Sequence, residues 1–86
     1  MTQATKLEVV RMFRSENGGA IKAFCDLQFD DDFIVKGFKV VQGKEGMFIG
    51  MPSELGKTGR WFNTFLCLSN DAKSRIDQTV MAAYEE

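Results

Sequence analysis

The sequence predicts a single α+β domain in which an antiparallel sheet of about five strands packs against one C-terminal helix. Apolar and polar residues alternate over several short segments in the first two thirds of the chain, with the period of a half-buried strand. Turns rich in glycine separate these segments. From Asn70 onward the apolar residues recur at helical spacing instead. Because 86 residues suffice for one such domain, residues 1–86 are assigned to it as a whole.

The first two strands are expected to form an antiparallel hairpin. Residues 7–13 alternate, so that one side of the strand holds Leu7, Val9, Arg11 and Phe13. Residues 21–29 alternate in the same way, and their core-facing set is predicted to be Ala23, Cys25, Leu27 and Phe29. Between the two segments, Asn17-Gly18 favours the positive φ angles of a tight turn.

A second hairpin is predicted from residues 33–41 and 47–51, joined by a glycine turn at residues 43–46. One face of its first strand is expected to hold Ile34, Phe38 and Val40. Pro52 has no N–H for a ladder, so it is expected to end the second strand of this hairpin. A loop over residues 54–60 is expected to follow.

A fifth strand is expected over residues 61–68 and the C-terminal helix over residues 70–84. The strand is apolar on both sides, which indicates burial by the helix on one face and by a second subunit on the other. Ser69 is a suitable N-cap for the helix, and Lys73 and Asp77 are opposite charges four residues apart. The apolar stripe that packs on the sheet is predicted to be Ala72, Ile76, Val80, Ala83 and Tyr84.

Catalysis and cofactor binding are not expected. The chain has no histidine, so the commonest general base near neutral pH is missing. Cys25 and Cys67 lack the spacing of a zinc site and are expected to be buried thiols. The glycine turn at residues 43–46 lacks the lysine-serine that follows in a phosphate loop. The aspartates at 30–32 suit a solvated turn better than a divalent-cation site, because the other ligands of a calcium loop are absent. We therefore expect no enzyme activity, cofactor, metal or small-molecule substrate.

The sequence also predicts a cytoplasmic protein without a membrane partner. No apolar run approaches the roughly 18 residues that cross a bilayer. The N-terminal residues are polar and do not form an export signal.

Binding is the class of function that remains. Eleven basic and twelve acidic side chains give a net charge of −1, so binding to a polyanion has to rest on a local patch. Basic residues cluster at three places, which are Arg11 with Arg14, Lys57 with Arg60, and Lys73 with Arg75. The second and third clusters can converge if the ends of the fifth strand fold back or if a dimer supplies the second set.

The second hairpin resembles the signature of the SpoVG family, small bacterial proteins named for stage V of sporulation and septum placement. The resemblance rests on Gly43, Gly46 and residues 47–53, Met-Phe-Ile-Gly-Met-Pro-Ser, and extends over about residues 7–84. It implies a regulator that binds DNA, and in some cases RNA, and that forms dimers through its sheets. The family's contact region at the start of the helix matches Asn70, Asp71, Ala72 and Lys73, with Arg75 just beyond. Asp71 stands where small hydroxyl residues are usual, and its charge opposes a phosphate.

The sequence therefore favours a nucleic-acid-binding regulator of gene expression and septation that acts as a homodimer. Its predicted phosphate-binding residues are Lys73, Arg75, Asn70, Lys57 and Arg60. One alternative is a protein–protein interaction module that docks a partner through a sheet edge or through Trp61 and Phe62. Another is an oligonucleotide-binding barrel of the cold-shock kind, suggested by Lys36-Gly37-Phe38 and five strands.

Overall fold

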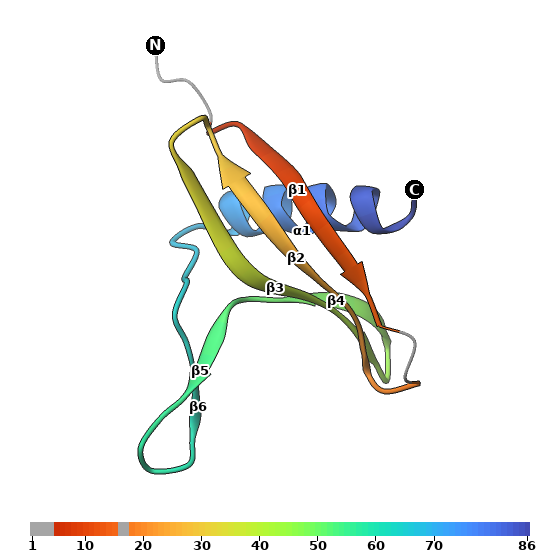
Figure 1. Ribbon diagram of the computed structural model, residues 1–86, viewed down its shortest axis with the longest axis vertical. Helices are drawn as coiled ribbons and strands as arrows, with labels where there is room; N and C mark the ends of the chain where they lie inside the picture. The colour runs from red at the N-terminus through yellow and green to blue at the C-terminus, as the bar shows by residue number, and fades with distance from the viewer. Residues whose placement is uncertain (1–4, 16–17) are drawn as a thin grey trace.

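Four antiparallel strands form the main sheet, and one helix covers one of its faces (Figure 1). The computed structural model of the chain describes residues 5–15 and 18–86. The sheet has the order β1-β2-β3-β4, and two further strands, β5 and β6, pair separately. The elements are β1 (Leu7–Arg14), β2 (Ile21–Phe29), β3 (Phe33–Gly43), β4 (Gly46–Gly50), β5 (Ser53–Leu55), β6 (Trp61–Asn63) and α1 (Asn70–Tyr84). The predicted α+β class is confirmed, but the main sheet is open and holds four strands, with β1 and β4 at its edges.

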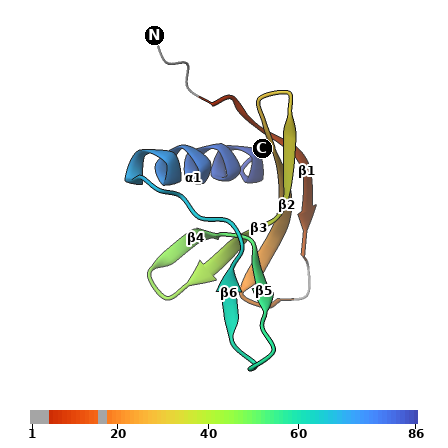
Figure 2. The same cartoon turned by 90° about the vertical axis from the view of Figure 1, so that its left-hand side faces the viewer.

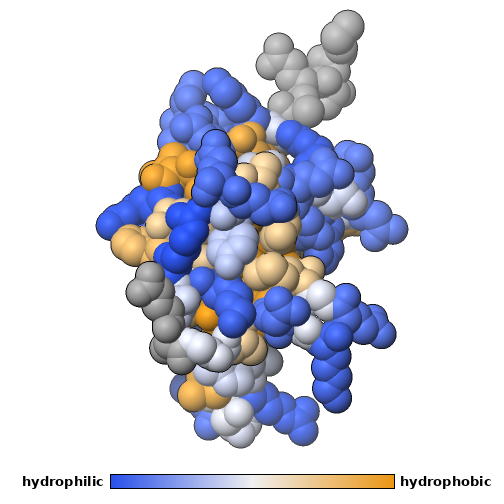
Figure 3. Space-filling view, turned by 90° about the vertical axis from the view of Figure 1, so that its right-hand side faces the viewer, coloured by the Kyte–Doolittle hydropathy of each residue, from blue (hydrophilic) through white to orange (hydrophobic). Residues whose placement is uncertain are grey.

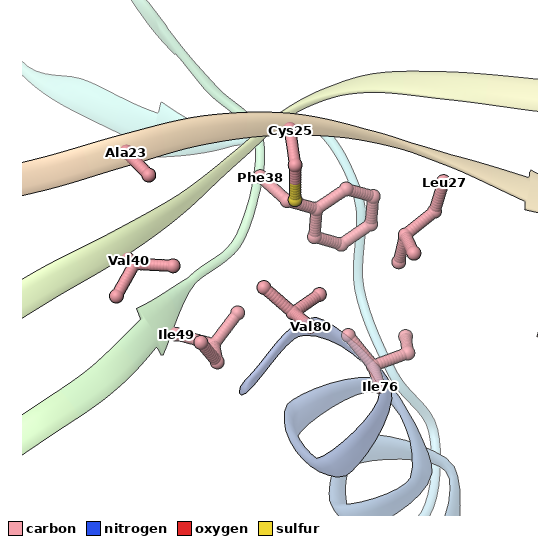
Figure 4. Packing of buried hydrophobic residues seen from close by; sticks show 8 residues of the cluster. All are labelled: Ala23, Cys25, Leu27, Phe38, Val40, Ile49, Ile76 and Val80. Carbon is pink, nitrogen blue, oxygen red and sulfur yellow. The ribbon is translucent and has the colours of Figure 1, made fainter. Parts of the chain in front are cut away.

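The core lies between α1 and the face of the sheet that we call the inner face. Ile76 and Val80 point from α1 toward the sheet (Figure 4). The buried sheet residues around them are Ala23, Cys25, Leu27, Phe38, Val40 and Ile49. Of the predicted helix stripe, Ile76, Val80 and Tyr84 lie in or against the core, and Met81, which was not predicted, packs there too. Three of the four predicted core residues of β2 are buried, and the fourth, Phe29, packs half-buried against the core. Within the described residues, no helix is both long and apolar enough to cross a bilayer.

Three register shifts interrupt the ladders of the sheet, and two of them change which predicted side chains face the core. The register of β1 with β2 shifts between Val9 and Arg11, so Met12 rather than Phe13 lies on the inner face. The register of β2 with β3 shifts between Cys25 and Asp26, opposite Gly37, whose φ of 101° is the kind of backbone angle that a bulge can require of glycine. The predicted positions of Phe13 and Ile34 are therefore wrong, because each strand alternates in the opposite phase beyond its bulge, and both side chains are more than half exposed.

The turns of the two hairpins agree with the predictions where the structure describes them. Gly43 pairs with Gly46, and Gly46 has a φ of 128°. The aspartates at 30–32 form the turn between β2 and β3, in which an Asp30 carboxylate oxygen accepts a hydrogen bond of 2.9 Å from the Lys6 N–H. Gly18 has the expected positive φ, but residues 16–17 lie outside the described part of the chain.

The predicted fifth strand is wrong in its place and length. Only Trp61–Asn63 is extended, and it pairs with Ser53–Leu55, a segment mostly expected to be loop, in a small hairpin apart from the sheet (Figure 2). The buried Pro52 explains why the chain leaves the sheet after β4. Pro52 packs beside Gly37, where a Cβ added to the glycine would lie 3.6 Å from the Cβ of Pro52. The Thr64 N–H then donates to the Pro52 carbonyl at 2.8 Å and closes the base of the hairpin.

Both cysteines are free, as predicted. Cys25 lies in the core and is 1% exposed, whereas Cys67 is half-buried. Burial, with a smaller contribution from the neighbouring Asp26 carboxylate, raises the pKa of the Cys25 thiol to about 11. Cys25 is therefore protonated and unreactive near neutral pH.

Candidate nucleic-acid interface

The start of α1 presents backbone N–H groups beside polar side chains. Ser69 caps the helix as predicted, and its hydroxyl oxygen accepts a hydrogen bond of 3.1 Å from the Ala72 N–H. A hollow of about 350 Å³ opens here, lined by Cys67, Leu68, Ser69, Asn70 and Lys73. The first turn of a helix has N–H groups without intrahelical partners and the positive end of the helix dipole, so this hollow suits an anion. The Asp71 carboxylate in the same turn opposes it.

Lys73 is the accessible cation of this end of the helix. Its ammonium lies 2.9 Å from an Asp77 carboxylate oxygen, and the Lys73 side chain is 49% exposed. An exposed pair of this spacing contributes only about 0.3–0.5 kcal/mol to stability. Lys73 can therefore exchange Asp77 for a phosphate at small cost.

Arg75 lies near the start of the helix, as predicted, but makes a contact that the sequence did not predict. It is half-buried, and its guanidinium donates a hydrogen bond to the Thr5 carbonyl oxygen. It also lines an apolar hollow of about 160 Å³ with Leu7, Phe29, Phe65 and Ile76 among its neighbours. Arg75 thus joins α1 to the chain just before β1. Its guanidinium therefore has a structural role in the fold, whether or not it also contacts a phosphate.

Lys57 and Arg60 lie far from the helix start. Both are exposed in the turn of the β5–β6 hairpin, where the Gly56 N–H donates to the Arg60 carbonyl at 2.7 Å. Figures 1 and 2 both place this turn at one end of the molecule's long axis, well away from α1. A single chain therefore does not bring Lys57 and Arg60 together with Lys73 and Asn70.

The first predicted cluster, Arg11 with Arg14, also separates. Arg14 holds the C-terminal end of α1, because its guanidinium donates to the Tyr84 carbonyl oxygen at 2.8 Å and lies 5.6 Å from the centre of the Tyr84 ring. Arg11 instead lies on the sheet, 4.7 Å from the centre of the Phe13 ring. Of the two arginines, only Arg11 has a guanidinium that does not contact the helix.

Sequence reasoning missed the opposite side of the sheet, which we call the outer face. Its register places Phe13, Phe24, Lys39 and Gly50 in one row across the four strands. The neighbouring row is Arg11, Asp26 and Lys36. Asp26 is 9% exposed, so the accessible charge of these two rows is positive. The isolated Gly37 inside a strand pattern was the available signal, because it marks the bulge that fixes this register.

Comparison with known proteins covers nearly the whole described chain. Residues 5–86 match the profile of the SpoVG family. The chain is 39% identical over 77 residues to the "Putative septation protein SpoVG" of Archaeoglobus fulgidus, across 90% of this chain and 91% of that protein. It is 32% identical over 76 residues to "Putative septation protein SpoVG 2" of Listeria monocytogenes, across 88% and 74%. It is 30% identical over 77 residues to the "Putative septation protein SpoVG" of Treponema denticola, across 90% of this chain and 83% of that protein.

Proposed function

The chain belongs to the SpoVG family, and from that premise we propose that it is a nucleic-acid-binding regulatory protein that acts as a homodimer. The binding role follows from the family resemblance, and the link to septation from the names of its relatives. The observation that carries the proposal is the start of α1, where Asn70 and Lys73 line one hollow with the helix N-terminus. Such a site takes the phosphates of a nucleic acid, and the protein has a binding role without catalysis.

A second subunit supplies what one chain lacks. One copy has a net charge of −1 and keeps the Lys57 and Arg60 turn apart from Lys73. A two-fold dimer brings two copies of each cluster to one assembly, so the turn of one copy can lie beside the helix of the other. This is how a nearly neutral chain holds a polyanion.

The segment between β6 and α1 offers apolar surface for such a contact. Leu68 is 98% exposed, and Leu66 is also exposed, although both line the hollow that Phe29 and Ile76 share. Phe33, opposite Phe29 in register, is exposed as well. Figure 3 shows apolar side chains interleaved with hydrophilic ones on another side of the molecule, without one continuous apolar face there. We therefore place the dimer contact at the exposed leucines of the linker.

A gel-shift titration in increasing salt, with single- and double-stranded DNA and RNA, tests the proposal. Lys73→Ala should weaken binding to all sequences alike and lower the slope of log affinity against log salt by about one. Lys44→Ala, which removes an exposed lysine from the β3–β4 turn, is the matched control and should change the slope less. Equal slopes for both variants would refute the helix start as the contact site. No binding by the unaltered protein would leave the protein–protein interaction module as the function.

A further inference from the structure

A hollow lies between the outer face of the sheet and the base of the β5–β6 hairpin. It has a volume of about 590 Å³ and is lined by Ile21, Phe24, Gly37, Lys39, Ser53 and Trp61. Trp61 is 68% exposed and Phe24 is 42% exposed, so two aromatic rings border the hollow and remain open to solvent. Gly37 lines the hollow with backbone alone.

The polar groups of the hollow are held in place. The Lys39 ammonium donates a hydrogen bond of 3.1 Å to the Ser53 hydroxyl, and Lys39 is half-buried. An ammonium has three donors, so two of them remain for a ligand. A positive donor beside aromatic rings suits a ligand that combines a flat π-system with negative charge or acceptor atoms.

The surface next to the hollow continues this chemistry. Phe13 lies beside Phe24 in register, and Arg11 packs over the Phe13 ring. Lys36 occupies the next row on β3. Exposed aromatic rings thus alternate with accessible cations over an open β-sheet, an arrangement that stacks bases and holds the intervening phosphates.

We propose that this hollow is a nucleobase slot for single-stranded nucleic acid, in which Trp61 and Phe24 stack on a base while Lys39, Lys36 and Arg11 contact its backbone. The proposal rests on the proposed function and names a second contact surface, separate from the helix start. A duplex cannot use the slot, because its bases are stacked and paired inside the helix. The ligand is therefore an unpaired segment of RNA or DNA.

Charge argues against a second copy of this chain as the occupant. A two-fold contact brings the same patch of both subunits together. The accessible charges of these rows are Arg11, Lys36 and Lys39, so this contact would place like charges on each other. A polyanion has the complementary sign.

Trp61 is the only tryptophan of the chain, so its fluorescence reports directly on the slot. Titration with a 12-nucleotide oligo-uridine or oligo-thymidine should quench it saturably, whereas a DNA duplex should not. Trp61→Ala and Phe24→Ala should each weaken single-strand binding by about 5- to 150-fold. Trp61→Phe, which keeps a stacking ring, should lose less, and Phe48→Ala, which removes an exposed ring of β4 outside the hollow, should bind normally.

The possible failures are distinguishable. In one outcome, single-strand binding depends on Lys73 and yet leaves Trp61 fluorescence unquenched and is equally strong in Trp61→Ala. That result would overturn the slot and leave the proposed function intact. Absence of binding to every nucleic acid would overturn both. A blue shift of Trp61 emission that grows with protein concentration, without nucleic acid, would show that a second copy covers the hollow and would overturn the slot. Far-ultraviolet circular dichroism of each variant identifies any loss of binding that is due to unfolding.

Discussion

The two faces of the main sheet use the same strands for different purposes. The inner face holds apolar side chains that α1 covers, with Phe38, Val40 and Leu27 fully buried. The outer face holds exposed aromatic and charged side chains, among them Phe24 and Lys36, and within the described residues no helix lies over them. Burial of apolar area is the main source of stability, so the inner face stabilises the fold and the exposed outer face contributes less to it.

The largest test of this comparison removes one ring from each face. Phe38→Ala should lower the free energy of unfolding by about 3–5 kcal/mol, because it opens a cavity in the core. Phe48→Ala, on the exposed side of β4, should cost much less. Urea unfolding followed by circular dichroism measures both. Similar losses in the two variants would mean that the outer face also stabilises the fold.

The bulge at Gly37 can be tested against a glycine of ordinary conformation. A Cβ at Gly37 or at Gly50 would have its nearest neighbour at 3.6 Å, so neither substitution makes a clash, but only Gly37 has positive φ. Gly37→Ala should therefore cost about 1–3 kcal/mol of backbone strain. Gly50→Ala should be nearly neutral in the same thermal melt. An equal effect of both would show that positive φ at Gly37 is not what fixes the bulge.

The inner face was predictable from the sequence to a greater extent than the outer face. The period of two in β2 identified Ala23, Cys25 and Leu27, and helical spacing identified Ile76 and Val80. A bulge inserts one residue without leaving a mark in the apolar pattern, so the phase of Phe13 and Ile34 beyond it was wrong.

The candidate site was predictable only where local rules apply. Ser69 and the first turn of α1 follow from capping preferences, which placed Asn70 and Lys73 correctly at the helix start. Contacts between distant segments do not follow from such rules. The hydrogen bond from Arg75 to Thr5 depends on how the elements pack and could not be predicted. For the rows across the outer face, Gly37 marks the place of a bulge but does not give the strand register beyond it.

Cys25 gives the inner face a pH dependence. Because burial raises the pKa of its thiol to about 11, the folded protein keeps a proton that the unfolded chain loses at lower pH. Stability from this group is fully present below the ordinary thiol pKa and should fall by about 1–3 kcal/mol as pH rises toward 11. Urea unfolding at pH 8 to 11 measures this fall, and the difference from Cys25→Ala isolates it from other titrations. A parallel decline in both proteins would contradict the assignment.

The smallest expected effect concerns Asp71. Asp71→Ser removes a carboxylate that opposes phosphate, so affinity for nucleic acid should rise in low salt. It also removes a favourable interaction with the helix dipole, so stability should fall by about 0.3–1 kcal/mol. Binding isotherms and thermal melts of the variant measure the two changes. Weaker binding would mean that the start of α1 faces away from the nucleic acid.

Sedimentation equilibrium at micromolar concentration tests the central claim, that two copies together form the nucleic-acid-binding unit. We expect a mass near twice the 9.7 kDa of one chain, and a further increase when an oligonucleotide is added. Leu66→Asp, which places a charge in the proposed dimer contact but outside the hollow at the helix start, should shift the protein toward the mass of one chain and weaken binding with it. A mass of 9.7 kDa that persists as concentration rises, with or without the oligonucleotide, would rule out the dimer as the binding unit.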